Sequence, residues 1–202
     1  PRRVGVAGDV RTWLLTDVVE PEEHRSDTYG ALAATVTGTR PDGVPRWGEA
    51  WAETVGPIGL NPVSVSGEIR QWKGFRALAD ELARHRDVVF YGGPGEEGEV
   101  ARIAGPHARS VGLDLPSFAL SLRKCRLFIS NDSGAAHFAR AVGVPTLVVY
   151  GSTGRRHTGP AGAAAVTGPP VPCRPCYGRR CDGYGLACLD IPVQRVLAAV
   201  EA

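Results

Sequence analysis

Short apolar runs alternate with segments of helical periodicity between residues 58 and 150, and this alternation most restricts the folds open to the chain. Val88–Tyr91 is a continuous apolar run, as in strands that are buried on both faces of a parallel sheet. Strands are predicted at residues 58–60, 87–91, 110–111, 126–130 and, as the last, 145–150, and helices at 72–82, from 96 onward, at 116–124 and at 133–142. The pattern predicts an α/β fold with a Rossmann-like, doubly wound and mostly parallel sheet.

Residues 1–56 do not show this alternation of strand and helix patterns. A helix is predicted at residues 28–36, with four apolar side chains on one face, those of Tyr29, Leu32, Ala33 and Val36. Residues 38–45 are rich in Gly and Pro and indicate a linker. We therefore predict a first part at residues 1–56 and a domain at residues 57–202. The 202 residues suit one domain or one and a half, and the absence of Met leads us to expect a piece of a longer protein.

Charge and hydropathy exclude several classes of protein. The chain has 23 Lys and Arg residues against 21 Asp and Glu residues, and this net charge of +2 argues against nucleic acid as a partner. Its apolar runs are shorter than the roughly 18 residues that a membrane helix needs. Pro1–Arg3 is followed by no apolar signal region. We therefore expect neither a transmembrane segment nor a secretory signal.

The string NDSGAAH, Asn131–His137, follows a predicted buried strand and opens a helix. Asp132, Ser133 and Gly134 stand where the free N–H groups and the dipole of a helix attract phosphate groups. His137 lies one helical turn further along and can reach the same opening. Taken alone, Asp132 or Ser133 would be a helix N-cap and His137 a core residue. The whole string instead indicates a phosphate or diphosphate site.

Two other predicted strand ends carry residues of interest. Glu96 follows a glycine-rich loop after the strand at 87–91, and its carboxylate could hold a pair of ribose hydroxyls, although such a loop is often only a turn. Arg70 and Lys73 flank Trp72 at a predicted helix start. A cation there can neutralise a phosphate, whereas elsewhere such residues form a solvated helix face.

Together these strings resemble glycosyltransferase family 9, the heptosyltransferases of lipopolysaccharide assembly. NDSGAAHFARAVGVPTLVVYGST, residues 131–153, is similar to the family's Asp-Ser/Thr-Gly-x-x-His signature and to the Ala-x-Gly-x-Pro-Thr and Gly-x-Thr strings that follow it. IGLNP, WKGFRALADEL and VVFYGGPGEE occur before it in the family's order. The resemblance covers residues 56–200 and extends into Val4–Val19, which looks like the closing part of the family's N-terminal domain.

The resemblance implies the C-terminal, donor-binding half of a two-domain GT-B enzyme. Its donor would be a nucleotide-activated sugar such as ADP-heptose, and its acceptor a lipopolysaccharide core or a related glycan. Donor-binding residues carried over from the family are Arg70, Glu96, Asp132, Ser133, Gly134 and His137. The Asp132–Gly134 turn would cradle the diphosphate, Glu96 would grip the ribose, and Arg70 would stand where relatives usually have Lys. Lys73 replaces the Pro of the family's Lys-x-Trp-Pro string, which puts the donor contact at Arg70 in question.

The same resemblance implies an inverting transferase without a catalytic metal. An Asp near the start of the family's N-terminal domain is expected to act as general base, and these residues do not include it. The catalytic residue is therefore unknown, and Asp9 is not assigned as the base because its context matches the late N-terminal domain. The family also implies a cytoplasmic protein that contacts the inner membrane peripherally.

Four of the five cysteines fall within sixteen residues, spaced C-x2-C-x4-C-x6-C: Cys173, Cys176, Cys181 and Cys188. Four thiolates in one loop can share a tetrahedral metal, so we predict a structural zinc or iron site in the loop at residues 173–188, here called the four-cysteine loop. This cysteine cluster resembles that of some bacterial autotransporter heptosyltransferases, in which cysteines bind an iron ion. Free thiols or a disulfide are the alternatives. Cys125 precedes an apolar strand and is predicted to be buried.

Two other functions remain open at this point. A Rossmann-like module with a four-cysteine metal site could bind nucleotide or nucleic acid without catalysis, although the small net charge disfavours nucleic acid. A dinucleotide-dependent oxidoreductase would need G-x-G-x-x-G after a strand with an acidic residue at the proper distance, and that pattern is missing.

Overall fold

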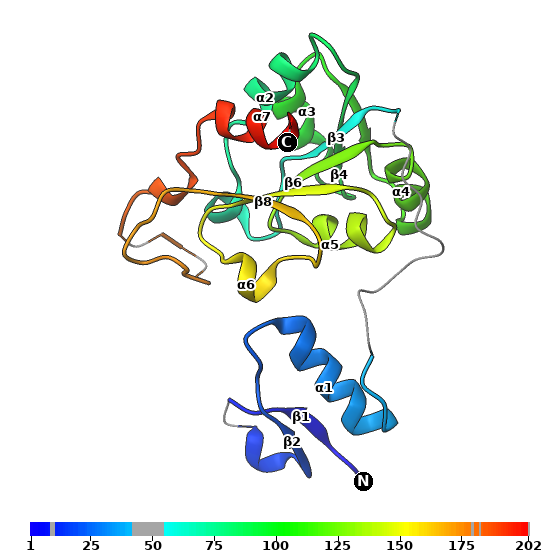
Figure 1. Cartoon of the computed structure of the whole chain (residues 1–202), viewed down its shortest axis with the longest axis vertical. Coiled ribbons are helices and arrows are strands. Elements are labelled where there is room, and N and C mark those ends of the chain that lie inside the picture. The colour runs from blue at the N-terminus through cyan, green and yellow to red at the C-terminus, as the bar shows by residue number, and fades with distance from the viewer. Residues whose placement is uncertain (9–10, 42–54, 179, 182, 202) are drawn as a thin grey trace. The chain divides into compact units, whose positions relative to one another are not determined.

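The computed structural model describes residues 1–8, 11–41, 55–178, 180, 181 and 183–201 (Figure 1). The chain divides into two compact units. Unit 1 comprises Pro1–Val44 with Arg156–Thr158, and unit 2 comprises Pro45–Arg155 with Gly159–Ala202. Asp9 lies outside the described residues.

In unit 1, one helix packs on two parallel strands. β1 (Val4–Val6) pairs with β2 (Asp17–Val19), η1 (Thr12–Leu14) lies between them in sequence, and α1 (Arg25–Thr37) contacts both strands. The helix predicted at residues 28–36 is therefore confirmed. Its apolar face is not buried within the described residues of the unit, because Tyr29 is 61% exposed and Val36 is 63% exposed.

Unit 2 is built on a parallel six-stranded sheet in the order β5-β4-β3-β6-β7-β8. Its strands are β3 (Ile58–Asn61), β4 (Val88–Gly92), β5 (Ala108–Val111), β6 (Leu127–Asn131), β7 (Thr146–Tyr150) and β8 (Ala164–Thr167). Its helices are η2 (Gly67–Arg70), α2 (Phe75–Leu82), α3 (Glu97–Ala104), α4 (Leu115–Leu122), α5 (Gly134–Ala141), η3 (Ala187–Leu189) and α7 (Val193–Glu201), and the short α6 (Arg155–Thr158) follows β7. This strand order, with the first strand in the middle, is that of the Rossmann fold, which confirms the predicted fold class.

The predicted strands and helices are present, but the sequence does not predict β8 or α7, and one helix begins later than expected. The strand at 145–150 is not the last, because β8 (Ala164–Thr167) adds a sixth strand beside β7. The helix predicted at 72–82 begins only at Phe75, after Gly74 at the N-cap, so Trp72 packs in the core from outside the helix.

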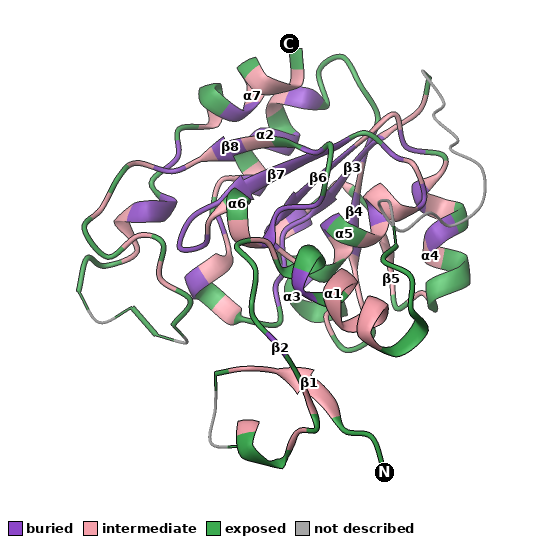
Figure 2. Ribbon diagram, turned by 60° about the horizontal axis from the view of Figure 1, so that its bottom comes forward, coloured by how far each residue is buried: buried purple, intermediate pink, exposed green. Residues whose placement is uncertain are grey.

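Helices cover both faces of the sheet (Figures 1 and 2). Side chains alternate along each strand, so Leu60 and Phe90 pack with α2 and α3 on one face, and Phe128 packs with α4 and α5 on the other. Gly59 allows the aromatic layer of this second face to approach β3, since a Cβ there would lie 2.8 Å from the Phe128 ring. Strands buried on both faces leave only their ends accessible to a ligand.

Candidate functional site

The carboxyl ends of β4, β3, β6 and β7 lie side by side at one edge of the sheet, because the strands are parallel and paired in that order. Strand order reverses between β3 and β6, since the chain moves outward in one direction from β3 and in the other direction from β6. Open α/β sheets bind ligands outside the carboxyl ends of the strands at such a reversal. A ligand is therefore expected beside the residues that follow β3 and β6.

The turn after β6 leaves the start of α5 open. Ser133 is the N-cap residue of α5 but makes no capping hydrogen bond through its side chain. Gly134 is exposed, and a Cβ built on it would meet no atom within 4 Å. Asp132 is only 4% exposed, whereas His137 is exposed, so the alternative of a core histidine is wrong. An open helix start of this kind suits an anionic group such as phosphate.

A buried polar network holds this turn against the neighbouring strand ends. The Ser133 hydroxyl lies 3.0 Å from the Ser130 hydroxyl, and Ser130 donates to the Asn61 side-chain oxygen at 3.3 Å. Asn131 is fully buried; its amide donates to the carbonyl oxygen of Pro62 at 2.8 Å and accepts from the backbone N–H of Trp72 at 3.0 Å. These bonds join the turn after β6 to the loop after β3, which carries Arg70.

Glu96 is held in place at the end of β4. Its side-chain oxygen Oε2 accepts a hydrogen bond from the backbone N–H of Gly93 at 2.7 Å. The glycine-rich loop between β4 and α3 thus bends back onto the carboxylate that follows it. A carboxylate fixed in this way can accept further hydrogen bonds from a ligand without reordering the loop.

Arg70, the last residue of η2, presents a cation with an unused donor. Its Nε atom is buried and finds no hydrogen-bond partner among the described residues. Buried polar atoms without a partner are rare in folded proteins, and a guanidinium pairs readily with phosphate. Lys73, the other predicted cation of this segment, is exposed. Arg70 is therefore the better candidate for an anionic ligand.

The end of β7 adds two residues that sequence reasoning did not single out. Burial, followed by the negative charge of Asp132, raises the pKa of the Tyr150 phenol, while Arg155 lowers it. Asp132, Tyr150 and Arg155 therefore lie within electrostatic range of one another at this edge of the sheet. The signal that could have revealed them is strand order, because β7 pairs directly with β6.

The thiols of the four-cysteine loop do not form a metal centre within the described part of the chain. Burial raises the pKa of the Cys188 thiol, and the charges of Cys176, Cys173 and Cys181 raise it further. The backbone N–H of Leu186, 3.3 Å from the sulfur, is the main cause of the lowered pKa of Cys181. Among the described residues, no three His, Cys, Asp or Glu side chains lie close enough to hold a metal ion. Cys125, outside the loop, is fully buried as predicted.

Comparison with known proteins places the chain in a family. The family model for Glycosyltransferase family 9 (heptosyltransferase) matches residues 56–184. The chain therefore belongs to glycosyltransferase family 9. The family resemblance inferred from the NDSGAAH string and its neighbours is confirmed.

Curated relatives and solved structures agree with this assignment. Lipooligosaccharide heptosyltransferase 2 of Campylobacter jejuni is 23% identical over 154 residues, which are 69% of this chain and 48% of the relative. The chain thus spans about half the length of that curated relative. The structure of E. coli ADP-heptose LPS heptosyltransferase II matches the whole chain and 69% of its own length, with a TM-score of 0.73 and 22% identity. The iron-containing dodecameric glycosyltransferase TibC of enterotoxigenic E. coli matches 84% of this chain and 51% of its own length, with a TM-score of 0.60 and 16% identity.

The likeness to these solved structures supports the GT-B architecture for the fold. Across the described ranges of the chain, we find no helix with the length and apolar character needed to span a bilayer.

Proposed function

We propose that unit 2 binds the nucleotide-activated sugar of an inverting glycosyltransferase, with ADP-heptose as the donor. The observation that carries this proposal is the open start of α5 at the point where the strand order reverses. Arg70 with its unpartnered Nε lies in the loop that is hydrogen-bonded to the α5 turn, and Glu96 follows β4, the strand on the other side of β3. The three features follow strands β4, β3 and β6 in that order, as a ligand lying along the edge would meet them.

Each part of the donor has a proposed partner. The diphosphate lies at the backbone N–H groups of the Asp132–Gly134 turn, with Ser133 beside them and His137 one turn further into α5. Arg70 pairs with the diphosphate oxygens, and the Glu96 carboxylate accepts from the ribose hydroxyls. The name of the E. coli heptosyltransferase that matches the whole chain includes ADP-heptose, which supports this donor.

In the proposed reaction these residues act on the leaving group. Single displacement at the sugar carbon needs a base on the acceptor hydroxyl and stabilisation of the negative charge that develops on the departing diphosphate. The N–H groups of α5 and the Arg70 guanidinium supply that stabilisation without a catalytic metal. We propose that the base belongs to the N-terminal domain of the family and that residues 1–56 are the end of that domain.

The proposed acceptor is a lipopolysaccharide core sugar or a related glycan. Support comes from the Campylobacter jejuni relative, whose name is lipooligosaccharide heptosyltransferase 2. Such an acceptor would place the protein at the cytoplasmic face of the inner membrane, in peripheral contact with it.

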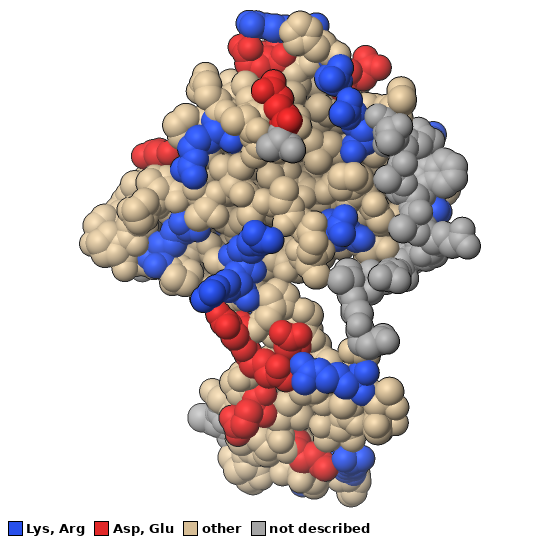
Figure 3. Space-filling view, viewed as in Figure 1, with Lys and Arg blue, Asp and Glu red and all other residues tan. Residues whose placement is uncertain are grey.

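Nucleic acid binding by a four-cysteine module is the weaker alternative. On the face drawn in Figure 3, Lys and Arg side chains of unit 2 form separate groups between uncharged areas. This distribution and the net charge of +2 both differ from the continuous basic surface of nucleic-acid-binding domains.

Thermal unfolding with three ligands separates these functions. We expect ADP to raise the melting temperature of the chain, because a ligand that binds only the folded state stabilises it. A single-stranded oligonucleotide should leave the melting temperature unchanged, and NAD, which contains the ADP unit, should raise it no more than ADP does. Stabilisation by the oligonucleotide and not by ADP would favour the four-cysteine module and reject the donor site.

We also propose that the four-cysteine loop holds one structural zinc or iron ion. Its four-thiol donor set suits either metal, and support comes from the iron-containing glycosyltransferase TibC, to which the chain is structurally similar. The thiols would have to move closer than they stand in the structure. A bound ion would cross-link the loop and would take no part in sugar transfer.

Elemental analysis tests the metal site. Protein purified from medium supplied with zinc and iron should carry about one equivalent of one of them, and Cys176→Ser should release it and lower the melting temperature. Cys125→Ser is the matched control, because Cys125 is a buried cysteine outside the loop. This variant protein should keep the metal. Metal-free wild-type protein would reject the site.

A further inference from the structure

Two hydrogen-bond paths connect the four-cysteine loop and its continuation to the residues on either side of Arg70. One path reaches Ile69, immediately before Arg70, and the other reaches Trp72, two residues after it. Both paths run through the interior of unit 2. Arg70 is thus the cation of a segment whose backbone is fixed on both sides.

The first path passes through Ser152, which follows β7. The backbone N–H of Cys176 donates to the Ser152 carbonyl oxygen at 2.8 Å. The Ser152 hydroxyl in turn donates to the carbonyl oxygen of Ile69 at 2.9 Å, and Ser152 is only 2% exposed. A single buried residue therefore joins the loop after β7, the four-cysteine loop and the segment that carries Arg70.

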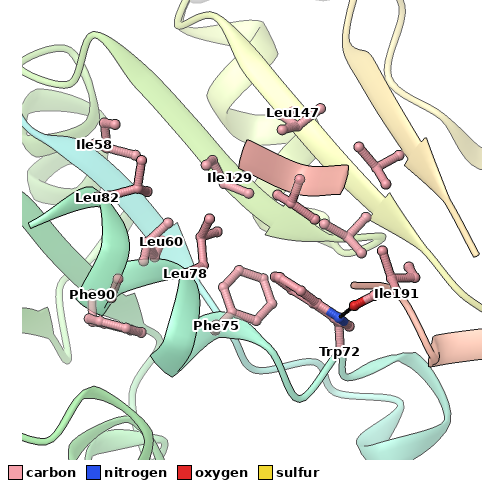
Figure 4. Packing of buried hydrophobic residues seen from close by; sticks show 14 of the residues in the cluster. Ile58, Leu60, Trp72, Phe75, Leu78, Leu82, Phe90, Ile129, Leu147 and Ile191 are labelled. Carbon is pink, nitrogen blue, oxygen red and sulfur yellow. Dashed lines mark hydrogen bonds between the residues drawn. The ribbon is translucent and has the colours of Figure 1, made fainter. Parts of the chain in front are cut away.

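The second path passes through Trp72. Its indole Nε1–H donates to the carbonyl oxygen of Ile191, three residues beyond Cys188, at 2.9 Å (Figure 4). The Trp72 side chain is 4% exposed and packs edge-to-face on Phe75 with ring centroids 5.2 Å apart. On the other side, the backbone N–H of Trp72 donates to the buried Asn131 amide oxygen at 3.0 Å. Trp72 thus connects the Arg70 segment both to the turn that precedes α5 and to the chain beyond the four-cysteine loop.

A long cationic side chain loses conformational entropy when it binds a ligand, and a mobile backbone would add to that loss. A backbone that is already fixed therefore lowers the entropic cost of placing the guanidinium on its ligand. We propose that Ser152, with Trp72, is a positioning residue that presets Arg70 for the diphosphate of the donor. The proposal rests on the function proposed above, since it assigns these residues to the same site. Ser152 touches no ligand in this account and acts through the Ile69 carbonyl.

A merely structural role for Ser152 would give a different result. If its hydroxyl only stabilised the fold, its loss would resemble the loss of any other buried hydroxyl near β7. Thr146 provides that comparison, because its buried hydroxyl also donates to a carbonyl oxygen, that of Val144, at 2.9 Å. Thr146 stands at the opposite end of β7, away from the candidate site.

The experiment is a double-mutant cycle on ADP affinity, measured by calorimetry. We expect Ser152→Ala to weaken ADP binding about fivefold, in line with the loss of one neutral hydrogen bond. Thr146→Val should leave ADP affinity unchanged at a similar cost in stability. In an Arg70→Ala background, Ser152→Ala should have no further effect, and adenosine affinity should be the same in all variants because adenosine lacks the phosphates.

The proposal would be overturned if Ser152→Ala weakened ADP binding equally in the wild-type and Arg70→Ala backgrounds. It would also be overturned if Thr146→Val weakened ADP binding as much as Ser152→Ala does. Should Ser152→Ala fail to fold, Trp72→Phe keeps the aromatic contact and removes the bond to Ile191, and it should show the same dependence on Arg70. Failure of the wild-type chain to bind ADP would reject the proposed function itself. Loss of affinity in Arg70→Ala without any effect of Ser152→Ala or Trp72→Phe would reject only the positioning role.

Discussion

Gly134→Val is expected to weaken ADP binding about 100-fold. This loss of affinity corresponds to the free energy of one or two hydrogen bonds from N–H groups to a charged ligand. The reason is steric, since a side chain at Gly134 would fill the open space at the start of α5 where the diphosphate should lie. Folding should change little, because no atom lies within 4 Å of a Cβ at this position. Calorimetric titration with ADP and thermal unfolding of the same protein measure the two effects.

The control is Gly30→Val in α1, which places the same substitution in a helix of unit 1. It should change the free energy of unfolding by less than about 0.5 kcal/mol, because valine and glycine differ little in helix propensity, and it should leave the ADP affinity unchanged. Unchanged ADP affinity in folded Gly134→Val would show that the diphosphate binds elsewhere.

Arg70→Ala should weaken ADP binding about tenfold to 100-fold, which is the range for one charge-assisted hydrogen-bond partner of a phosphate. Adenosine should bind equally well to both proteins, since the ribose partner Glu96 and the rest of the site are unchanged. Arg70→Lys should recover most of the affinity, because a lysine at this position keeps the positive charge that the phosphates need.

The comparison between ADP and adenosine decides what Arg70 does. An equal loss for both ligands in Arg70→Ala would mean that the substitution disturbs the whole site and that Arg70 is not the phosphate partner. Failure of Arg70→Lys to recover affinity would instead indicate that binding requires the two-pronged geometry of the guanidinium.

The sheet could be predicted from sequence because most of its strands are short, largely apolar runs between turn residues. The sequence does not predict β8 because AAVT begins with two alanines, which are weak strand formers, whereas VVFYG in β4 and TLVVY in β7 are rich in β-branched and aromatic residues. The helix start near residue 72 was misplaced for a different reason. Trp72 has helical spacing relative to Phe75 and Leu78, but tertiary contacts with the Ile191 carbonyl and Asn131 hold it outside the helix.

The candidate site could be predicted where its residues share one short string, as Asp132, Gly134 and His137 do. The bonds of Ser152 and Asn131 could not be found in this way. They reach residues 83 and 59 positions away along the chain and form only when β3, β6 and β7 pair in the observed order. Spacing along a sequence indicates local chemistry, whereas a hydrogen bond between distant loops depends on the topology of the sheet.

A crystal structure of the chain with bound ADP tests the central claim most directly. We expect the diphosphate at the backbone N–H groups of the Asp132–Gly134 turn, with the Arg70 guanidinium on its oxygens and the ribose hydroxyls on the Glu96 carboxylate. The account would be contradicted if ADP bound away from this edge of the sheet, for example against the four-cysteine loop, and contacted neither Arg70 nor Glu96.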